Sequence, residues 1–327
     1  MVADGHKTKP PSSVTYSSVV SRDSVRICLT YAALNDLDIL SGDIENAYLT
    51  APCREKVYIH AGKEFGSEEG CIFIITKALY GLKSSSAAFR AHLAEKLDDL
   101  HFKSCPADPD VWMRLSNKPD GEQYYEYTLV YVDDILCISH NPRAPLQEIA
   151  VDLKFKKDKI DPPSMYLGGR LEKKSLNGAQ VWTLSSLDYV KAAVEIAKTG
   201  ATKRGLKLPP ASTPMSSTAH PKLDSSFELN SKDITFYQEL IGMLQWAIEL
   251  GRVDIYHEVS ILSAYQASPW QGHLEELLHI FGFLNKHPKL TLYFNPDIPN
   301  IPIDTFNGDD SQVFCDQYRD AEEELPD

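Results

Sequence analysis

The sequence lacks long apolar runs and any cysteine pattern that could organise a fold. None of its apolar stretches approaches the roughly 20 residues that a transmembrane helix requires. Its polar N-terminal residues 1–11 lack the apolar segment of a secretory signal. Its six cysteines are far apart, without a CxxC spacing or an accompanying histidine pair, which argues against a zinc site and a disulfide framework. These absences predict a globular intracellular protein without a membrane partner.

Positive charge is also scarce. The chain has 33 Lys and Arg against 46 Asp and Glu, a net charge of −13, whereas nucleic-acid-binding proteins need basic residues for the phosphates. Much of the imbalance is local, because residues 304–327 contain nine acidic residues and one basic residue. Basic residues gather at 154–159 and 198–207. Such runs form either a solvated face or a backbone-binding stripe, and charge alone does not distinguish the two.

The remaining composition is that of an ordinary globular protein with a sizeable core. Apolar residues make up 43% and aromatic residues 10% of 327 residues, a length that suggests about two domains. Several elements are expected before residue 165. They are a helix capped by Ser24, strands at 37–43, 56–60 and 71–80, a helix after the serines at 84–86, and a β-hairpin at 124–139. This order predicts an α+β fold with helices on one face of an antiparallel sheet.

Beyond residue 165 the pattern becomes mostly helical, and a poorly ordered acidic stretch is expected at 301–327. The last helix would have Ser268 as its N-cap and Pro269 in its first turn. The expected elements are a strand pair at 166–172 and 181–184, a helix through Val190 and Val194, a Pro/Ser/Thr-rich linker at 208–223, and helices at 233–251, 254–267 and 270–286. The expected divisions of the chain are therefore 1–165, 166–300 and 301–327.

Two adjacent acids, Asp133 and Asp134, interrupt an otherwise apolar β-run. Like charges side by side are costly in a buried strand. They lie either on an exposed hairpin turn, where Asp is common, or in a shared site that binds a hard divalent cation. Asp43, which ends another predicted strand, favours the second interpretation. Carboxylates that converge at one end of a sheet suit two-metal phosphoryl transfer.

Three segments resemble motifs of copia-type retrotransposon reverse transcriptases. Tyr131-Val132-Asp133-Asp134 resembles their Tyr-x-Asp-Asp box, residues 43–49 resemble their earlier Asp-containing motif, and residues 79–83 are similar to their Leu-Tyr-Gly-Leu-Lys segment. A single Tyr-x-Asp-Asp box is a weak signal, but these motifs occur in the order of the family. Further similarity extends over about residues 2–296.

The resemblance implies an RNA-directed DNA polymerase, a nucleotidyltransferase. Residues 1–165 would hold a palm with partial fingers, and residues 166–300 would hold a primer-grip hairpin and a mostly helical thumb- or connection-like region. Asp43, Asp133 and Asp134 would be catalytic and would bind two Mg²⁺ ions, for which Mn²⁺ could substitute. The ions would align a primer 3′-hydroxyl with the α-phosphate of a deoxynucleotide.

The same resemblance implies residues that contact nucleotide, template or primer. Tyr48 would lie under the sugar and exclude a 2′-hydroxyl, although without the motif it would be interpreted as a core aromatic. Lys83 would meet a template phosphate or lie in solvent. The residues implied near the nucleotide or template are Ile44, Ala47, Tyr48, Tyr80, Gly81 and Lys83. The residues implied for the primer grip are Tyr166, Leu167 and Gly168.

Partners and location follow from the resemblance as well. The partners would be a primed RNA or DNA template and deoxynucleotides. A second copy of the chain, or the ribonuclease H and integrase segments of a polyprotein active in DNA integration, would be further partners. The location would be the cytoplasm or a virus-like particle.

The sequence departs from the family pattern at two places. Ser84-Ser85-Ser86 replaces the Gln-Ala-Pro that usually follows the Leu-Tyr-Gly-Leu-Lys segment, and the basic fingers strand that normally precedes residues 2–5 is absent. The chain is therefore expected to be a fragment of a polyprotein or a decayed copy, and catalytic activity is left open. The alternatives are an inactive remnant that keeps the fold with weak nucleic-acid binding, and an unrelated carboxylate-dependent phosphohydrolase.

Overall fold

An antiparallel sheet carries the acidic residues. In the computed structural model, which describes residues 8, 10–11, 13–176 and 178–296, the strand order of this sheet is β1-β7-β6-β5-β4. The strands are β1 (Asp38–Asp43), β4 (Lys103–Cys105), β5 (Asp108–Asn117), β6 (Gln123–Tyr131) and β7 (Asp134–Ser139). The hairpin predicted at 124–139 is confirmed as β6–β7. The strand predicted at 37–43 is confirmed as β1, which pairs with β7 along its whole length.

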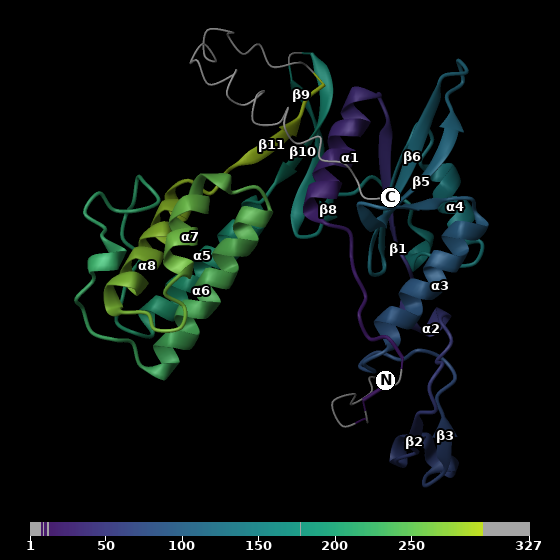
Figure 1. Ribbon diagram of the computed structural model, residues 1–327, viewed down its shortest axis with the longest axis horizontal. Helices are drawn as coiled ribbons and strands as arrows, with labels where there is room; N and C mark the ends of the chain where they lie inside the picture. The colour runs from purple at the N-terminus through teal and green to yellow at the C-terminus, as the bar shows by residue number, and fades with distance from the viewer. Residues whose placement is uncertain (1–7, 9, 12, 177, 297–327) are drawn as a thin grey trace, which may run out of the picture. The chain divides into compact units, whose positions relative to one another are not determined.

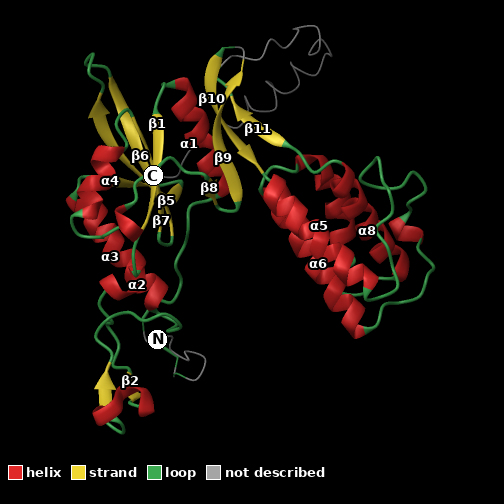
Figure 2. Cartoon of the chain, turned by 180° about the vertical axis from the view of Figure 1, so that it is seen from behind, coloured by secondary structure: helices red, strands yellow, loops and turns green. Residues whose placement is uncertain are grey.

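Helices cover both faces of this sheet. The helices of this half are α1 (Arg22–Leu34), α2 (Ala47–Thr50), α3 (Ser85–Asp99) and α4 (Arg143–Ala150). Leu136 and Ile138 share a buried cluster with α1, whereas Ile135 and Cys137 share another with α3 and α4. Figures 1 and 2 show the sheet between α1 on one side and α3 with α4 on the other. The prediction of helices on one face is therefore wrong. Four consecutive apolar residues of β7 point alternately to the two faces, so both faces have to be buried.

A small separate sheet lies between α2 and α3 in the chain. Among the described residues, β2 (Tyr58–His60) and β3 (Ile72–Ile74) pair with each other and with no third strand. The 3-10 helix η2 (Lys63–Glu68) connects them. The strand predicted at 71–80 is shorter than expected, because beyond residue 75 only an isolated bridge between Pro52 and Lys77 remains.

A second antiparallel sheet follows, with the strand order β11-β10-β9-β8. Its strands are β8 (Met165–Tyr166), β9 (Gly169–Leu176), β10 (Ala179–Ser185) and β11 (Thr291–Phe294). The strand pair predicted at 166–172 and 181–184 is confirmed as β9–β10. Leu171 and Trp182 pack in the same cluster as α1. Apolar contacts thus cross the division expected at residue 165, and that division stays a prediction.

Helices α5 (Leu187–Thr202), α6 (Ser231–Glu249), α7 (Tyr256–Ser263) and α8 (Gln271–Lys286) pack around a separate apolar cluster. They confirm the helices predicted in this half. Tyr237 is fully buried there, and its hydroxyl donates to the carbonyl oxygen of Leu262 at 2.7 Å. The short 3-10 helices η4 (Pro221–Leu223) and η5 (Val253–Ile255) lie in the connections.

The segment predicted to be a linker, residues 208–223, is packed against α8. Lys286 Nζ donates to Ser212 Oγ at 2.8 Å, and Ser216 Oγ donates to Glu276 Oε1 at 2.8 Å. The approach is close, because a Cβ atom at Gly282 would lie 1.9 Å from the carbonyl oxygen of Pro209. The composition of this segment predicts little regular structure, but it does not exclude packing.

Two predicted helix starts are wrong. The N-cap of α1 is Ser21, whose hydroxyl accepts a hydrogen bond from the N–H of Ser24, so Ser24 lies inside the first turn. The N-cap of α8 is Trp270 instead of Ser268, and His273 Nδ1 accepts from its N–H at 3.1 Å. The side chain of His273, three residues into the helix, caps the N–H of Trp270 and so sets where the helix begins. A search for Ser, Thr, Asp or Asn at the N-cap does not detect such a start.

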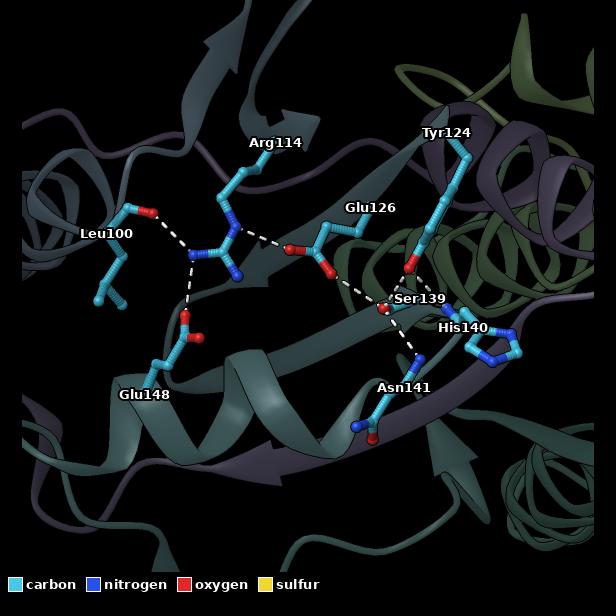
Figure 3. A network of polar contacts seen from close by, with 8 residues as sticks. All are labelled: Leu100, Arg114, Tyr124, Glu126, Ser139, His140, Asn141 and Glu148. Atoms are coloured by element: carbon cyan, nitrogen blue, oxygen red, sulfur yellow. Dashed lines mark hydrogen bonds and ion pairs between the residues drawn. The ribbon is translucent and has the colours of Figure 1, made fainter. Parts of the chain in front are cut away.

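A buried polar network connects the strands to α4 (Figure 3). Glu126 of β6 is 4% exposed, and its carboxylate accepts from Arg114 Nε at 2.7 Å and from Ser139 Oγ at 2.9 Å. Arg114 also donates to Glu148 of α4 at 2.8 Å. The Tyr124 hydroxyl bonds to Ser139 Oγ at 2.9 Å. The buried charge of Glu126 is therefore paired and hydrogen-bonded, as a stable fold requires.

Two further expectations concern the whole chain. Within the described ranges, no helix combines the length and apolar character that crossing a membrane would need. The cysteines described there are free thiols: Cys28, Cys53, Cys71, Cys105 and Cys137. The acidic stretch 301–327 lies outside the described residues.

Candidate active site

Asp43 and Asp134 lie opposite each other across two paired strands. Asp43 is the last residue of β1 and Asp134 the first of β7, and they are partners in the antiparallel register. The N–H of Ile44 donates to the carbonyl oxygen of Asp133 at 2.8 Å, which holds the hairpin tip beside the end of β1. The early acid and the acidic pair therefore meet at one end of the sheet, as the sequence predicts.

The hairpin tip is strained at Val132. Tyr131 pairs with Asp134, so Val132 and Asp133 form a two-residue turn, and Val132 has a φ of +58°. A β-branched residue rarely adopts this conformation, because its Cβ crowds the backbone. Such strain persists only where the surroundings enforce it, often at functional sites. The turn and the functional interpretation of the Asp pair are thus compatible, since the turn is held against β1.

A lysine bridges two of the carboxylates. Lys156 Nζ donates to Asp43 Oδ2 at 2.7 Å and lies 3.9 Å from Asp133 Oδ2. Lys156 begins the short 3-10 helix η3 (Lys156–Asp158). Its hydrogen bond to Asp43 is the largest influence on its pKa, which is raised. The ammonium therefore stays charged at neutral pH and neutralises part of the acidic cluster.

The third carboxyl, that of Asp134, has a different electrostatic environment, which raises its pKa. Burial by the surrounding protein, followed by the charges of Asp43 and Asp133, raises the pKa of Asp134 from 3.8 to about 6, and Lys156 acts in the opposite direction. Asp134 keeps contact with solvent. Its surroundings disfavour the bare anion, so this carboxyl favours a proton or a nearby cation.

The acidic residues fit a hard divalent cation, although the described residues contain no group of three Asp, Glu, His or Cys side chains close enough together to enclose one. Asp43 Oδ1 is buried, and no residue in the described ranges forms a hydrogen bond with it. Mg²⁺ prefers carboxylate oxygens as protein ligands, and this oxygen lies beside a second carboxylate. Asp43 and Asp133 are therefore the residues that could hold such an ion. The predicted participation of Asp134 stays a prediction.

Aromatic side chains lie beside the carboxylates. Tyr48 of α2 contacts Tyr80, with ring centroids 4.6 Å apart, and Phe89, with centroids 6.0 Å apart. Tyr48 thus has core-like neighbours, yet it is only partly buried. Burial first, and the charge of Asp133 second, raise the pKa of Tyr80. Its phenol is therefore within electrostatic reach of the acidic cluster.

The other residues predicted to meet nucleotide or template differ in accessibility. Ile44 and Ala47 are 0% and 1% exposed, so a ligand could reach only their backbone. Gly81 is exposed, with a φ of +93° that favours glycine. Lys83 is exposed, and its Nζ donates to the backbone oxygen of Thr8 at 3.2 Å. A template phosphate would have to replace that contact.

The residues predicted to grip the primer form a tight hairpin. Tyr166 pairs with Gly169, and Leu167 and Gly168 between them have φ values of +50° and +83°, as in a type I′ turn. Tyr166 is buried, and its pKa is raised by this burial and, secondly, by the charge of Asp134. The hairpin therefore lies within electrostatic reach of the acidic cluster, while its role stays a prediction.

The sequence does not predict the position of Lys156. It stands among the lysines at 154, 156, 157 and 159, which are equally typical of a solvated face. Tertiary contacts, such as the isolated bridge between Ile44 and Phe155, bring this side chain to the carboxylates. Alternation along an extended segment could group Lys154 with Lys156, but it could not identify the acidic partners.

Comparison with known proteins finds similar sequences among polymerases and transposon proteins. Residues 1–210 match the family described as reverse transcriptase (RNA-dependent DNA polymerase). The chain is 28% identical, over 88% of its length, to the retrovirus-related Pol polyprotein from transposon RE1 of Arabidopsis thaliana. It is 25% identical, over 82% of its length, to the one from transposon TNT 1-94 of Nicotiana tabacum.

The matched part is a small fraction of these plant polyproteins. It covers 19% of the first and 20% of the second, so the chain spans about a fifth of their length. A putative transposon Ty5-1 protein of Saccharomyces cerevisiae is 27% identical, over 74% of both chains.

Proposed function

Because the chain belongs to the reverse transcriptase (RNA-dependent DNA polymerase) family, with copia-type Pol polyproteins among its relatives, we propose that it is the RNA-directed DNA polymerase segment of such an element. The observation that carries this proposal is the convergence of Asp43 and Asp133 at the end of the sheet, where both carboxylates face the ammonium of Lys156. Residues up to about 165 would act as palm and partial fingers, and residues 166–300 as primer grip and thumb- or connection-like region.

The proposed chemistry is nucleotidyl transfer onto a primer 3′-hydroxyl. Two bound Mg²⁺ ions would lower the pKa of that hydroxyl and stabilise the leaving pyrophosphate. Asp43 and Asp133 would hold positive charge at the point where the α-phosphate is attacked, and Asp134 would add negative potential from the first position of β7. The rigid pairing of β1 with β7 supports this role, because it fixes the carboxylates before substrate binds.

Tyr48 is proposed to act in sugar selection. Its ring is braced by Tyr80 and Phe89, so it cannot easily move aside for a bulkier sugar. A 2′-hydroxyl on the incoming nucleotide would meet this ring. The residues proposed to approach nucleotide or template through their backbone are Ile44, Ala47 and Gly81, and Tyr166 to Gly168 would approach the primer.

The remaining activities of the plant relatives are proposals for the longer polyprotein. The names of these relatives describe Pol polyproteins from transposons, of which this chain corresponds to about a fifth. We propose the following features only for the longer polyprotein: ribonuclease H and integrase segments, dimerisation, and a cytoplasmic or virus-like-particle location.

Primer extension tests the proposal. We expect the protein to extend a labelled DNA primer on an RNA template when Mg²⁺ and deoxynucleotides are supplied. Asp133→Asn should lower the extension rate on the order of 100-fold or more, because it removes one anionic ligand from the reacting centre. The matched control is Asp99→Asn on α3, where the side chain is 73% exposed, and it should leave the rate unchanged.

Three other outcomes would contradict the proposal. Equal extension by the wild type and Asp133→Asn would remove Asp133 from the mechanism. Release of phosphate from simple esters without a template would indicate a carboxylate-dependent phosphohydrolase. Absence of extension, with retained fold and weak nucleic-acid binding, would indicate an inactive remnant.

The inactive remnant is the second candidate, and the surroundings of Lys83 favour it. This lysine is bonded to the backbone of Thr8 and is followed by Ser84-Ser85-Ser86 in place of the usual Gln-Ala-Pro. Addition of a basic fingers segment in cis separates the two candidates. Restored extension would indicate an active polymerase that needs a longer chain, and continued inactivity would indicate a remnant.

A further inference from the structure

Lys156 is the cation that the acidic cluster holds within the described part of the chain. Its Nζ is 2.7 Å from Asp43 Oδ2 and 3.9 Å from Asp133 Oδ2, and no other described Lys, Arg or His forms an ion pair with either carboxylate. The three side chains come from β1, from the tip of the β6–β7 hairpin and from η3. One ammonium therefore joins two carboxylates that would otherwise repel each other.

The segment that carries Lys156 is anchored to β1 and to the residues that directly follow it. The N–H of Ser41 donates to Asp161 O at 2.9 Å, and the N–H of Glu45 donates to Lys154 O at 2.8 Å. Phe155 is 2% exposed and lies directly over Gly42, where a Cβ atom would come within 2.6 Å of its ring. Backbone hydrogen bonds on both sides of η3, and a glycine that leaves room for Phe155, therefore place the ammonium beside the carboxylates. A loose surface lysine would have none of these contacts.

A divalent cation bound by these carboxylates and the Lys156 ammonium would repel each other. Lys156 Nζ donates a hydrogen bond to Asp43 Oδ2, whereas Asp43 Oδ1 is buried and has no hydrogen-bond partner among the described residues. A cation bound between Asp43 and Asp133 would lie within a few ångströms of Nζ, and at such distances repulsion between positive charges is substantial near a protein surface. Half of the Lys156 side chain is exposed, at 52%, so the ammonium has solvent into which it can move.

We propose that Lys156 is a positioning residue that competes with the divalent cation. Its ammonium holds Asp43 and Asp133 together when no divalent ion is bound, and the ion has to displace it. Lys156 thereby weakens metal binding and restricts filling of the site to conditions in which the metal is abundant or arrives with a substrate. This inference rests on the proposed function, because it assumes that Asp43 and Asp133 bind metal.

Binding of Mn²⁺, measured by the loss of the free-ion EPR signal, tests the competition. Lys156→Gln should bind Mn²⁺ about tenfold more tightly than the wild type, because a positive charge beside the site is removed. Lys157→Gln is the matched control: it removes the same charge from the adjacent residue, which has no ion pair with a described residue, and should change the affinity less than twofold. Lys156→Arg keeps the charge and should stay within twofold of the wild type.

A second measurement uses the unaltered protein and does not depend on whether a variant folds. Acetic anhydride modifies exposed amines, and mass spectrometry reports the rate at each lysine. Addition of Mg²⁺ should raise the modification rate of Lys156 severalfold, since the ammonium is released from Asp43, while the rate at Lys157 stays constant. Unchanged reactivity of Lys156 would contradict displacement.

The outcomes separate this inference from the proposed function. If Asp133→Asn does not weaken Mn²⁺ binding, the acidic cluster is not the metal site, and the proposed function fails. If Asp133→Asn abolishes binding but Lys156→Gln binds no more tightly than Lys157→Gln, the metal site stands and the competition by Lys156 is wrong. Weaker binding by Lys156→Gln would likewise overturn it, since the lysine would then support the metal.

Discussion

Asp134 is a carboxyl whose ionisation the fold disfavours. Its strand partner is Asp43 and its chain neighbour is Asp133, and burial together with these charges raises its pKa to about 6. A group whose pKa is raised on folding binds its proton more tightly in the folded state. Its contribution to stability is therefore present below about pH 4, and it is lost as the pH rises toward 6.

The first prediction at the residue scale concerns Asp134→Asn in EDTA. At pH 7.5 the variant should be more stable than the wild type by about 1 kcal/mol, with solvent screening of this exposed carboxyl allowed for. The difference should shrink between pH 6 and pH 4, because the wild-type carboxyl becomes protonated. Urea unfolding at several pH values measures this. Asp99→Asn should not reproduce it, and a difference that is independent of pH would contradict an origin in the ionisation of Asp134.

At the scale of elements, β7 joins the site to the core. Its first residue is Asp134, its apolar residues pack on both faces of the sheet, and its last residue, Ser139, donates to the buried Glu126. The network in Figure 3 connects β5, β6, β7 and α4 through Arg114. The carboxylates are thus presented by strands that are fixed at their opposite ends.

Glu126→Ala tests that connection. Removal of one partner leaves the positive charge of Arg114 partly buried and without its closest partner, so the free energy of unfolding should fall by about 3 kcal/mol. Glu122→Ala is the control, because its side chain is 57% exposed in a surface pair with Lys118, and its effect should stay within about 0.5 kcal/mol. Chemical denaturation followed by circular dichroism measures both. Equal losses would mean that the network does not stabilise the sheet.

At the scale of the whole molecule, the described chain has separate apolar clusters. One is formed by α5 to α8, and two lie on the faces of the main sheet. Regions with separate cores often open as separate units. The helical region is therefore expected to lose stability without loss of the sheet that carries the acids.

Gly282→Ala tests this separation. The added methyl would collide with the carbonyl oxygen of Pro209, so hydrogen exchange should accelerate in α5 to α8, with a loss of about 2 kcal/mol in opening free energy. Exchange in β1, β6 and β7 should be unchanged. Gly242→Ala in α6 is the control: apart from its chain neighbours and the adjacent helix backbone, no atom of the described residues lies within 4 Å of the added Cβ, and helix propensity should stabilise the protein by about 0.5–1 kcal/mol. Uniform acceleration over the whole chain would indicate one cooperative unit.

Local patterns predict some parts of this fold and site and miss others. The β6–β7 hairpin, β1 and the long helices carry strong periodic signals over many residues, and they occur where they are predicted. α4 is not predicted, because it has only 8 residues and its buried Pro145, Leu146 and Ile149 give too short a periodic signal. β11 is not predicted either, since Thr291 to Phe294 become a strand only by pairing with β10, far earlier in the chain.

What the sequence by itself determined is the set of acidic residues and the order of the motifs around them. Asp43, Asp133 and Asp134 stand out because charge interrupts apolar strands, and this is a local property. The tertiary structure alone decided that both faces of the sheet are covered and that Lys156 joins two of the carboxylates. The physical reason is that strand pairing and ion pairing over long chain separations depend on which segments meet in space, and one lysine among several carries no local mark of its partner.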